Sequence, residues 1–551
     1  MEKLGYAFIW AFVGSSCFVV GCTPHDTNSP AVESGAGSPG EGGSSGSSND
    51  NDAGDAGTGG KQLIVGGASG TDPSTITEPN ENSTTGGRSS SGGNGTGGSP
   101  PDDDAGAPGA SSEAGSAGDA GSSGAVGNAG SASSGGAGGS ANTAPGPLNG
   151  YTFFSYQDAI GNLSESELID MNGNVVRRWS VGGTPIKMLP GGDVIGTVGI
   201  FPGDTDALKM TQVSWAGDER WSFQNFAPVG DGTFASRQHH DFQREGNPVG
   251  YWAPGQDFVD HGSTLVLAHS RRNAPDIRPD PLDDDVIYEV DGDGNLKGAT
   301  WQAADHVAEF GFDEAALADI RTRNPGTTLD WLHLNSMSLV GPNHWYDEGH
   351  PEFAPENLII SSRNAAFVAI IERATGKIVW RIGPDFAGRP EEKLGQFSGQ
   401  HNPHLIPKGL PGAGNMIVFD NGWSSGWGGD NGTYRYSRGW SRVVEFNPVT
   451  LDVVWQYGSE TGSDQIFSFI LSNEQRLPNG NTVITLGALA KIIEVTPSKE
   501  VVWQYDYTQA PVYPGQIWLY RSYRIAPEWL PADFNAAHGN YSRWGDLFPT
   551  R

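Results

Sequence analysis

The chain has 551 residues, with 64 acidic and 33 basic side chains and a formal net charge of −31. This charge argues against nucleic acid as a partner, because binding the phosphate backbone requires a basic surface. The two cysteines, Cys17 and Cys22, both lie near the N-terminus, so the rest of the chain can form neither a disulfide nor a zinc–thiolate site.

Residues 1–22 are predicted to be an export signal. Lys3 precedes an apolar run that is too short to span a membrane as a stable helix, and the run ends in Val-Val-Gly-Cys. This ending resembles a bacterial lipobox and predicts lipidation of Cys22; the alternative is a plain signal peptide with an incidental cysteine. Several acyl chains anchor a protein stably, so we expect a lipoprotein of the cell envelope. Thr23, rather than Asp, follows the cysteine, which by resemblance to enterobacterial lipoproteins favours the outer membrane, facing the periplasm or the cell surface.

Residues 23–148 consist mostly of Gly, Ser, Ala, Asp and Asn. Such a composition cannot bury enough apolar surface to fold, so the segment is predicted to be a disordered tether. A flexible chain of this length spans roughly 60 Å on average. It would lift the domain that follows away from the membrane.

Residues 149–551 repeat one pattern, in which a strand-like apolar run and a turn are followed by a strand that carries tryptophan. The repeats with this pattern are 167–179, 286–301, 367–380, 442–455 and 491–503, with a looser version that ends at Trp221. A strand, a Gly-rich turn and another strand follow most of them. Four strands in each of six units predict an all-β fold, a six-bladed β-propeller, with the repeated tryptophans packed between blades.

Helix is expected to be scarce, and residues 313–323 are the best candidate. Asp291, Asp293 and Asn295 faintly resemble a calcium loop, but no glutamate closes the site, so a hairpin turn is predicted there. We therefore expect no metal site, and the sequence points to no cofactor.

Four polar side chains stand at the entries or ends of predicted strands. By the order of the repeats, His240 falls in the second blade, His333 and Arg363 in the third, and His401 in the fourth. Loops at one end of a propeller converge on the central channel. Three histidines and one arginine there would form a cationic pocket for an anion such as sulfate, phosphate or carboxylate.

The stretches that carry these residues resemble the bacterial arylsulfotransferase (arylsulfate sulfotransferase) family over residues 150–530. The matching motifs are HHDFQ, DWLHLNS, IISSRN, QHNPHLIPKG and QRLPNGNTVIT. The resemblance implies a six-bladed propeller in the periplasm. It also implies transfer of a sulfuryl group from an aryl sulfate ester to a phenolic acceptor, without a nucleotide donor, through a sulfated histidine in ping-pong fashion.

The resemblance also implies roles for single residues. His401 matches the nucleophilic histidine, and His240, His333 and Arg363 match the residues that hold the sulfuryl oxygens and assist proton transfer. Other side chains are expected to support them: Asp241 orients His240, Asn335 and Asn402 contact the substrate, His404 packs behind the site, and His239 is the less favoured neighbour of His240.

The chain departs from the family in lacking an N-terminal β-sandwich domain and a disulfide. Residues 251–285 and 422–440 look like long blade insertions that supply Trp and Tyr for stacking on a phenol ring. A different class of function stays open, namely a non-catalytic surface propeller that binds an anion, a glycan or a protein. A quinone-cofactor dehydrogenase is more distant, because neither additional blades nor an acidic metal cluster is evident. The sequence leaves a homodimer possible.

Overall fold

The computed structural model divides the chain into two units, residues 1–129 and 130–551. It describes residues 146–158, 163–201, 205–230, 232–428, 436–508, 517–538 and 542–548, all in the second unit. The predicted signal, Cys22 and nearly all of the predicted tether lie outside the described residues. Within the described ranges, no helix has the length and apolar character needed to cross a membrane.

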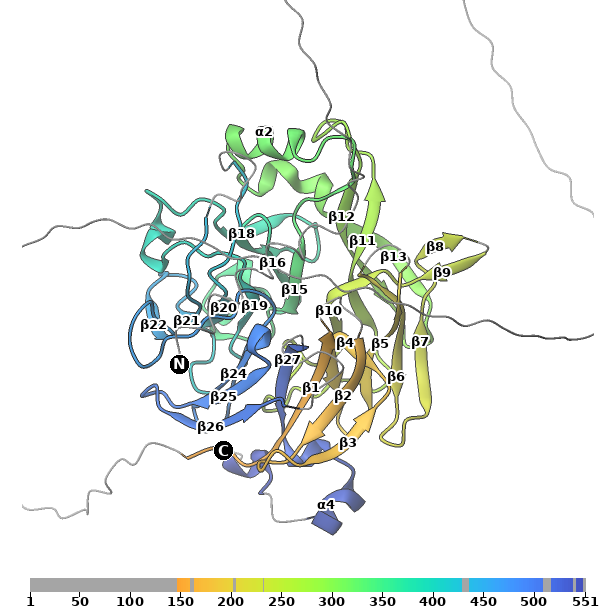
Figure 1. The fold of residues 1–551 in the computed structure, drawn as a ribbon, viewed down its shortest axis with the longest axis vertical. Helices are drawn as coiled ribbons and strands as arrows, with labels where there is room; N and C mark the ends of the chain where they lie inside the picture. Colours follow the sequence, from red (N-terminus) through yellow and green to blue (C-terminus); the bar gives the residue numbers. More distant parts are fainter. Residues whose placement is uncertain are drawn as a thin grey trace, which may run out of the picture. The chain divides into compact units, whose positions relative to one another are not determined.

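Six four-stranded antiparallel sheets form the six-bladed β-propeller that the repeats predict (Figure 1). From the inner to the outer strand, the first three blades are β27 (Ile517–Ile525), β1 (Tyr151–Asp158), β2 (Leu163–Ile169), β3 (Val175–Trp179); β4 (Gly182–Met188), β5 (Val194–Ile200), β6 (Ala207–Val213), β7 (Glu219–Phe223); and β10 (Gln238–Arg244), β11 (Thr264–Arg272), β12 (Leu282–Val290), β13 (Leu296–Gln302). The last three are β15 (Leu334–Leu339), β16 (Leu358–Ser362), β17 (Phe367–Ile371), β18 (Ile378–Ile382); β19 (His401–Leu405), β20 (Met416–Asp420), β21 (Arg442–Phe446), β22 (Val453–Tyr457); and β23 (Asn473–Arg476), β24 (Thr482–Leu486), β25 (Lys491–Val495), β26 (Val501–Asp506).

A few elements lie outside the blades. The added strands are the hairpin β8 (Ala227–Gly230) and β9 (Thr233–Ala235), and β14 (Leu329–Asp330), which pairs in parallel with β12. The α-helices are α2 (Glu314–Thr322), α3 (His344–Asp347) and α4 (Ala532–His538), and the 3-10 helices are Ala303–Glu309, Pro351–Phe353, Pro390–Leu394, Gly487–Leu489, Pro527–Trp529 and Trp544–Leu547. Helix α2 confirms the helix predicted at 313–323, and the Asp313 side chain caps it by accepting from Ala316 N at 2.7 Å.

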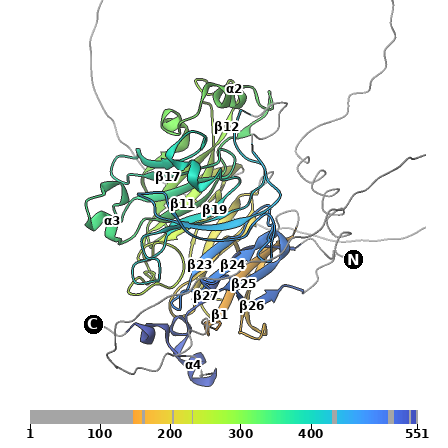
Figure 2. The same ribbon diagram turned by 90° about the vertical axis from the view of Figure 1, so that its left-hand side faces the viewer.

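The ring is closed by a strand from the other end of the chain. Strand β27 pairs antiparallel with β1, and Figures 1 and 2 both show the two strands side by side. The first blade therefore takes its innermost strand from the C-terminal part of the chain. The predicted blade numbers are one too low, because two blades, with outer strands β3 and β7, precede β10: His240 lies in the third blade, His333 and Arg363 in the fourth, and His401 in the fifth.

The repeated tryptophans join neighbouring blades, as predicted. Each indole N–H donates to a carbonyl of the next blade, at 2.8 to 3.3 Å: Trp179 to Ser214, Trp301 to Gly376, Trp380 to Pro448, Trp455 to Pro497, and Trp503 to Met171. The bond from Trp503 links the last blade back to the first. Trp221 differs, because its indole N–H has no hydrogen-bond partner and its ring faces the Arg244 guanidinium at 5.3 Å.

The predicted hairpin turn at 291–295 is confirmed, but the predicted blade insertion at 251–285 is not. The turn at 291–295 is a hairpin turn, because it joins β12 to β13 and Asp291 Oδ1 accepts from the backbone N–H groups of Asp293 and Asn295 at 3.0 and 2.8 Å. The prediction of a blade insertion at 251–285 is wrong, since this range contains β11 and the start of β12. Its Tyr251 and Trp252 are buried in the core rather than offered to a substrate.

Candidate active site

The inner strands bring the predicted site residues together. His240 lies on β10, His333 immediately precedes β15, Arg363 immediately follows β16, and His401 begins β19. The pairing of β10, β15 and β19 with the next strand is interrupted by a β-bulge near these positions. Bulges redirect side chains and are common beside active sites.

The backbone is left-handed at the same places. His240 has a φ of 55°, His333 of 51° and Asn402 of 58°. Non-glycine residues rarely adopt such values, and each costs of the order of 1–3 kcal/mol that the surrounding fold must offset. In the fifth blade the left-handed residue is Asn402, so His401 stands one position earlier than His240 and His333 in their blades.

The contacts of the His401 imidazole fix its tautomer. Its Nδ1 lies 2.9 Å from the Gly399 carbonyl oxygen and 2.8 Å from Asn421 Oδ1. The Asn421 amide is itself oriented, because its Nδ2 donates to the carbonyls of Ser468 and Leu471 at 2.8 and 2.9 Å. Two acceptors therefore face Nδ1, which must carry the proton. The other nitrogen, Nε2, is buried without a hydrogen-bond partner and presents an unshared electron pair.

The surroundings also keep this imidazole uncharged. Burial lowers the pKa of His401 to about 3; the hydrogen bond with Asn421 opposes the shift, and the positive charges of Arg521 and Arg363 add to it. The side chain is 1% exposed. A neutral imidazole with a free Nε2 is the form that can act as a nucleophile.

His240 and His333 lie beside each other and near His401. Their ring centres are 4.5 Å apart, and the centre of His240 is 6.5 Å from that of His401. His333 Nδ1 contacts the carboxylate of Asp330. His240 Nδ1 lies 2.7 Å from the Tyr520 hydroxyl, which donates to the His240 carbonyl at 2.8 Å. With its only proton used in that way, Tyr520 must accept from Nδ1–H, which leaves Nε2 of His240 as an acceptor.

Arg363 supplies a positive charge that is not already neutralised. Its backbone N–H donates to the His333 carbonyl at 3.1 Å, and its Nη1 donates to Asn364 Oδ1 at 2.8 Å. Among the described residues, no carboxylate forms an ion pair with its guanidinium. Arginine without a carboxylate partner, beside a nucleophile, is suited to bind an anionic group through paired oxygens.

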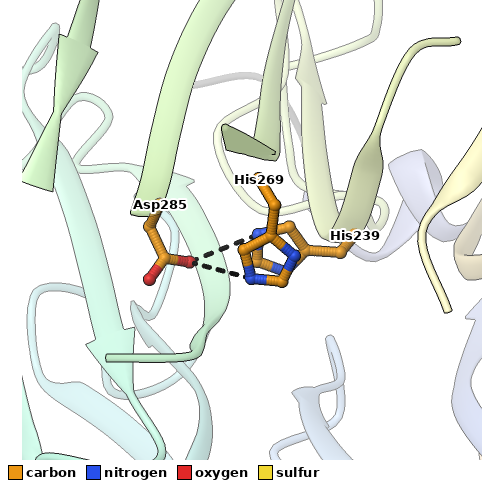
Figure 3. A group of neighbouring side chains, drawn as sticks. All are labelled: His239, His269 and Asp285. Carbon is orange, nitrogen blue, oxygen red and sulfur yellow. Dashed lines mark ion pairs between the residues drawn. The ribbon is translucent and has the colours of Figure 1, made fainter. Parts of the chain in front are cut away.

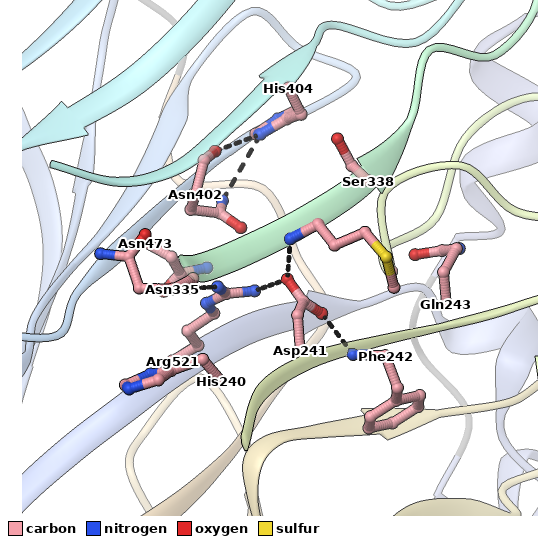
Figure 4. A network of polar contacts seen from close by, with 12 residues as sticks. His240, Asp241, Phe242, Gln243, Asn335, Ser338, Asn402, His404, Asn473 and Arg521 are labelled. Carbon is pink, nitrogen blue, oxygen red and sulfur yellow. Dashed lines mark hydrogen bonds and ion pairs between the residues drawn. The ribbon is translucent and has the colours of Figure 1, made fainter. Parts of the chain in front are cut away.

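Arg521, on β27, is a central residue that the sequence analysis missed. Its Nη1 lies 2.8 Å from Asp241 Oδ2, and its Nη2 donates to the Asn335 carbonyl at 2.9 Å (Figure 4). Lys187 Nζ lies 2.9 Å from the other Asp241 oxygen, Oδ1. The predicted contact of Asp241 with His240 is thus absent, since Asp241 binds two cations instead. Recognising Arg521 would have required assigning 517–525 as the closing strand.

The other predicted support residues lie around this centre. Asn335 is fully buried, and its Nδ2 donates to the Gln400 carbonyl at 2.7 Å, while its Oδ1 has no partner. Asn402 Nδ2 donates to the Glu474 carbonyl at 3.2 Å. His404 is packed behind the site, with Nδ1 2.8 Å from the Asn402 carbonyl and Nε2 2.9 Å from the Tyr251 hydroxyl.

Half-buried aromatic rings adjoin the loops that hold His401. Trp423, two residues after Asn421, has its ring centre 6.1 Å from that of Phe467 and 6.1 Å from that of Phe469. Phe469 lies 6.2 Å from Trp518 at the start of β27. Trp423 falls in the predicted insertion 422–440, of which residues 429–435 lie outside the described residues.

Residues 255–521 match the family model described as Arylsulfotransferase (ASST). This range includes His333, Arg363 and His401, and it confirms the resemblance seen in the sequence. The match supports aryl sulfotransferase activity in general, which implies an aryl sulfate donor and a phenol acceptor. No curated protein matches the chain.

The solved structures that are similar to the chain are distant. A protein of unknown function from Bacteroides caccae is 11% identical, with a TM-score of 0.37, covering 68% of this chain and 99% of its own. Apo AztD from Citrobacter koseri is 12% identical, with a TM-score of 0.28; the match covers 68% of this chain and 98% of AztD. The Cps50 (Swd1) β-propeller domain from Myceliophteria thermophila is 7% identical, with a TM-score of 0.32, covering 69% and 98%.

Proposed function

With an arylsulfotransferase (ASST) domain at residues 255–521, we propose that the protein moves a sulfuryl group from an aryl sulfate to a phenol through a sulfated His401. The observation that carries the proposal is Nε2 of His401, which has no hydrogen-bond partner among the described residues and whose imidazole is held neutral near the positive charge of Arg363. An acceptor-only nitrogen beside a cation is suited to attack an anionic ester, because the cation offsets the charge of the incoming group.

In the first step, His401 Nε2 attacks sulfur, an N–S bond forms, and the S–O bond to the aryl group breaks. The bonding electrons leave with the aryl oxygen. Positive charge develops on the imidazole, and its Nδ1–H is stabilised by Gly399 and Asn421. Arg363 holds the sulfuryl oxygens, over which the negative charge of the transition state spreads.

The departing phenolate needs a proton. We assign this to His333, whose Nδ1 contacts the Asp330 carboxylate, so that the aspartate orients the ring. In the second step, the acceptor phenol attacks sulfur, the N–S bond breaks, and His333 takes the phenol proton. His240, whose ring centre lies 4.5 Å from that of His333, positions the His333 ring for this transfer.

The aryl ring of each substrate needs an apolar surface near His401. We assign the aromatic cluster of Trp423, Phe467, Phe469 and Trp518 to this role, because its half-buried rings adjoin the segments that position Asn421. The lipid anchor at Cys22, the tether at 23–148 and an outer-membrane location complete the proposal. They rest on the sequence alone.

The test is transfer from nitrophenyl sulfate to a second phenol by the purified protein. Wild type should release nitrophenolate and form the new aryl sulfate, and His401→Ala should do neither. His350→Ala is a matched control, because this histidine is 35% exposed and pairs with Glu352 away from the site. An active His401→Ala variant contradicts the proposal, and inactive wild type with several aryl sulfates favours the non-catalytic binding protein.

A further inference from the structure

A second group of polar side chains lies inside the third blade, next to the candidate active site. Strands β10, β11 and β12 place His239, His269 and Asp285 together (Figure 3). Asp285 Oδ1 lies 3.2 Å from His239 Nε2 and 3.9 Å from His269 Nε2. The proposed reaction uses none of the three.

These side chains are buried, but several of their polar atoms lack a hydrogen-bond partner among the described residues. Their exposed fractions are 4% for His239, 4% for His269 and 0% for Asp285. Among the residues that the structure describes, neither nitrogen of His239 has a hydrogen-bond partner, nor has His269 Nε2 or Asp285 Oδ2. Several unpartnered polar atoms at one buried point indicate a bound water or ion, because buried polar groups are otherwise paired.

The contacts around His269 orient its ring as a metal-ligating imidazole is oriented. His269 Nδ1 lies 2.9 Å from Asp206 Oδ1, and Arg237 Nη2 lies 2.6 Å from the other Asp206 oxygen. The carboxylate therefore holds the Nδ1–H of His269, and Nε2 turns its electron pair toward Asp285. A carboxylate behind a ligating imidazole is the usual arrangement at metal sites.

We propose that His239 Nε2, His269 Nε2 and Asp285 bind a divalent first-row transition metal ion such as Zn²⁺. Bonds of about 2.0–2.1 Å to one ion place two ligand atoms roughly 3.0–3.4 Å apart. The 3.2 Å contact already fits this spacing. The His239 and His269 rings are stacked, with centres 3.6 Å apart and planes 7° apart, so one imidazole must turn to bring both nitrogens to the same ion and to shorten the 3.9 Å contact. Two imidazole nitrogens favour such an ion over Ca²⁺ or Mg²⁺, which prefer oxygen ligands.

A second carboxylate lies close enough to balance the charge of the ion. Asp330 Oδ1 is 3.8 Å from His269 Nε2 and has no hydrogen-bond partner, while the other Asp330 oxygen contacts His333. Without an ion, the alternative is a protonated His269: burial opposes its charge, but Asp206, Asp330 and Asp285 outweigh burial and raise the pKa of His269. That alternative predicts no stoichiometric metal binding.

The full-length chain, stripped with a chelator and dialysed, should take up one Zn²⁺ or Co²⁺ per chain, measured by elemental analysis and by visible absorption of Co²⁺. Zn²⁺ should also raise its Tm. His239→Ala and Asp285→Asn should each weaken metal binding by about 100-fold or more. Loss of a residue that only hydrogen-bonds to a metal ligand already lowers metal affinity by about 10–100-fold. His261→Ala should bind as wild type, because His261 forms an exposed pair with Asp293 at the same 3.2 Å.

X-ray absorption of the Zn²⁺-loaded wild type tests the proposed site even if the variants fail to fold. It should show imidazole nitrogen ligands at about 2.0–2.1 Å. The proposal is overturned if the wild type binds neither ion stoichiometrically, if the absorption shows no imidazole ligands, or if folded His239→Ala and Asp285→Asn bind as tightly as wild type. None of these readouts depends on sulfuryl transfer.

Discussion

Replacing Arg363 by alanine should remove most of the transfer activity and leave the fold intact. In the resting protein the guanidinium makes one side-chain hydrogen bond, to Asn364, so truncation costs about 1 kcal/mol of stability or less. In the transition state it is expected to donate two charge-assisted hydrogen bonds to sulfuryl oxygens, worth about 1.5–3 kcal/mol each. Their loss corresponds to a fall in kcat/KM of about 10²–10⁴-fold.

The assay is release of nitrophenolate from nitrophenyl sulfate with a fixed phenol acceptor. Arg363→Lys should fall between wild type and Arg363→Ala, because lysine keeps the charge and loses the planar fork. Arg373→Ala is the matched control, since Arg373 is 36% exposed and pairs with Glu289 on the surface. A folded Arg363→Ala that keeps kcat/KM within tenfold of wild type would refute the assigned role.

Three further outcomes are expected. Because burial lowers the pKa of His401 to about 3, its Nε2 stays unprotonated between pH 8 and 5, so the first nitrophenolate burst of a His333→Gln variant, which lacks the assigned proton donor, should show no inflection near 6.5; such an inflection would contradict a neutral, buried nucleophile. Arg521→Ala leaves Asp241 with only Lys187 as a charged partner, and chemical denaturation should show a loss of about 3–5 kcal/mol; a loss below 1 kcal/mol would contradict this network. Deleting residues from 517 onward removes β27 and opens the ring, which circular dichroism and thermal melting should report as loss of the cooperative transition, whereas a native-like melt would show that closure is dispensable.

The propeller could be predicted because its repeats leave a periodic trace in the sequence. The strand–turn–Trp pattern reveals the outer strands in the sequence. The tryptophans recur because each joins its blade to the next. The closing strand leaves no such trace. Its pairing with β1 joins positions more than 350 residues apart, and no local pattern distinguishes an inner strand that belongs to the first blade.

The residues of the candidate site could be predicted from sequence motifs, but the contacts of their side chains could not. His240, His333, Arg363 and His401 lie in stretches that resemble one family. The structure places the three histidines on or next to inner strands and Arg363 at the end of the second strand of its blade. Asp241 was misjudged because Asp follows His in the sequence, and adjacency along a strand places the two side chains on opposite faces. Asn421, His269 and Asp285 lie outside the motifs named above, so only the folded chain reveals what they contact.

The central claim is that the sulfuryl group rests on His401 between donor and acceptor. Mass spectrometry of the protein mixed with an aryl sulfate alone, followed by peptide mapping under conditions that preserve N–S bonds, tests it directly. One added sulfuryl group is expected on His401, and it should disappear when a phenol is supplied. Transfer that proceeds with His401 unmodified, or a sulfuryl group carried on another residue, would contradict it.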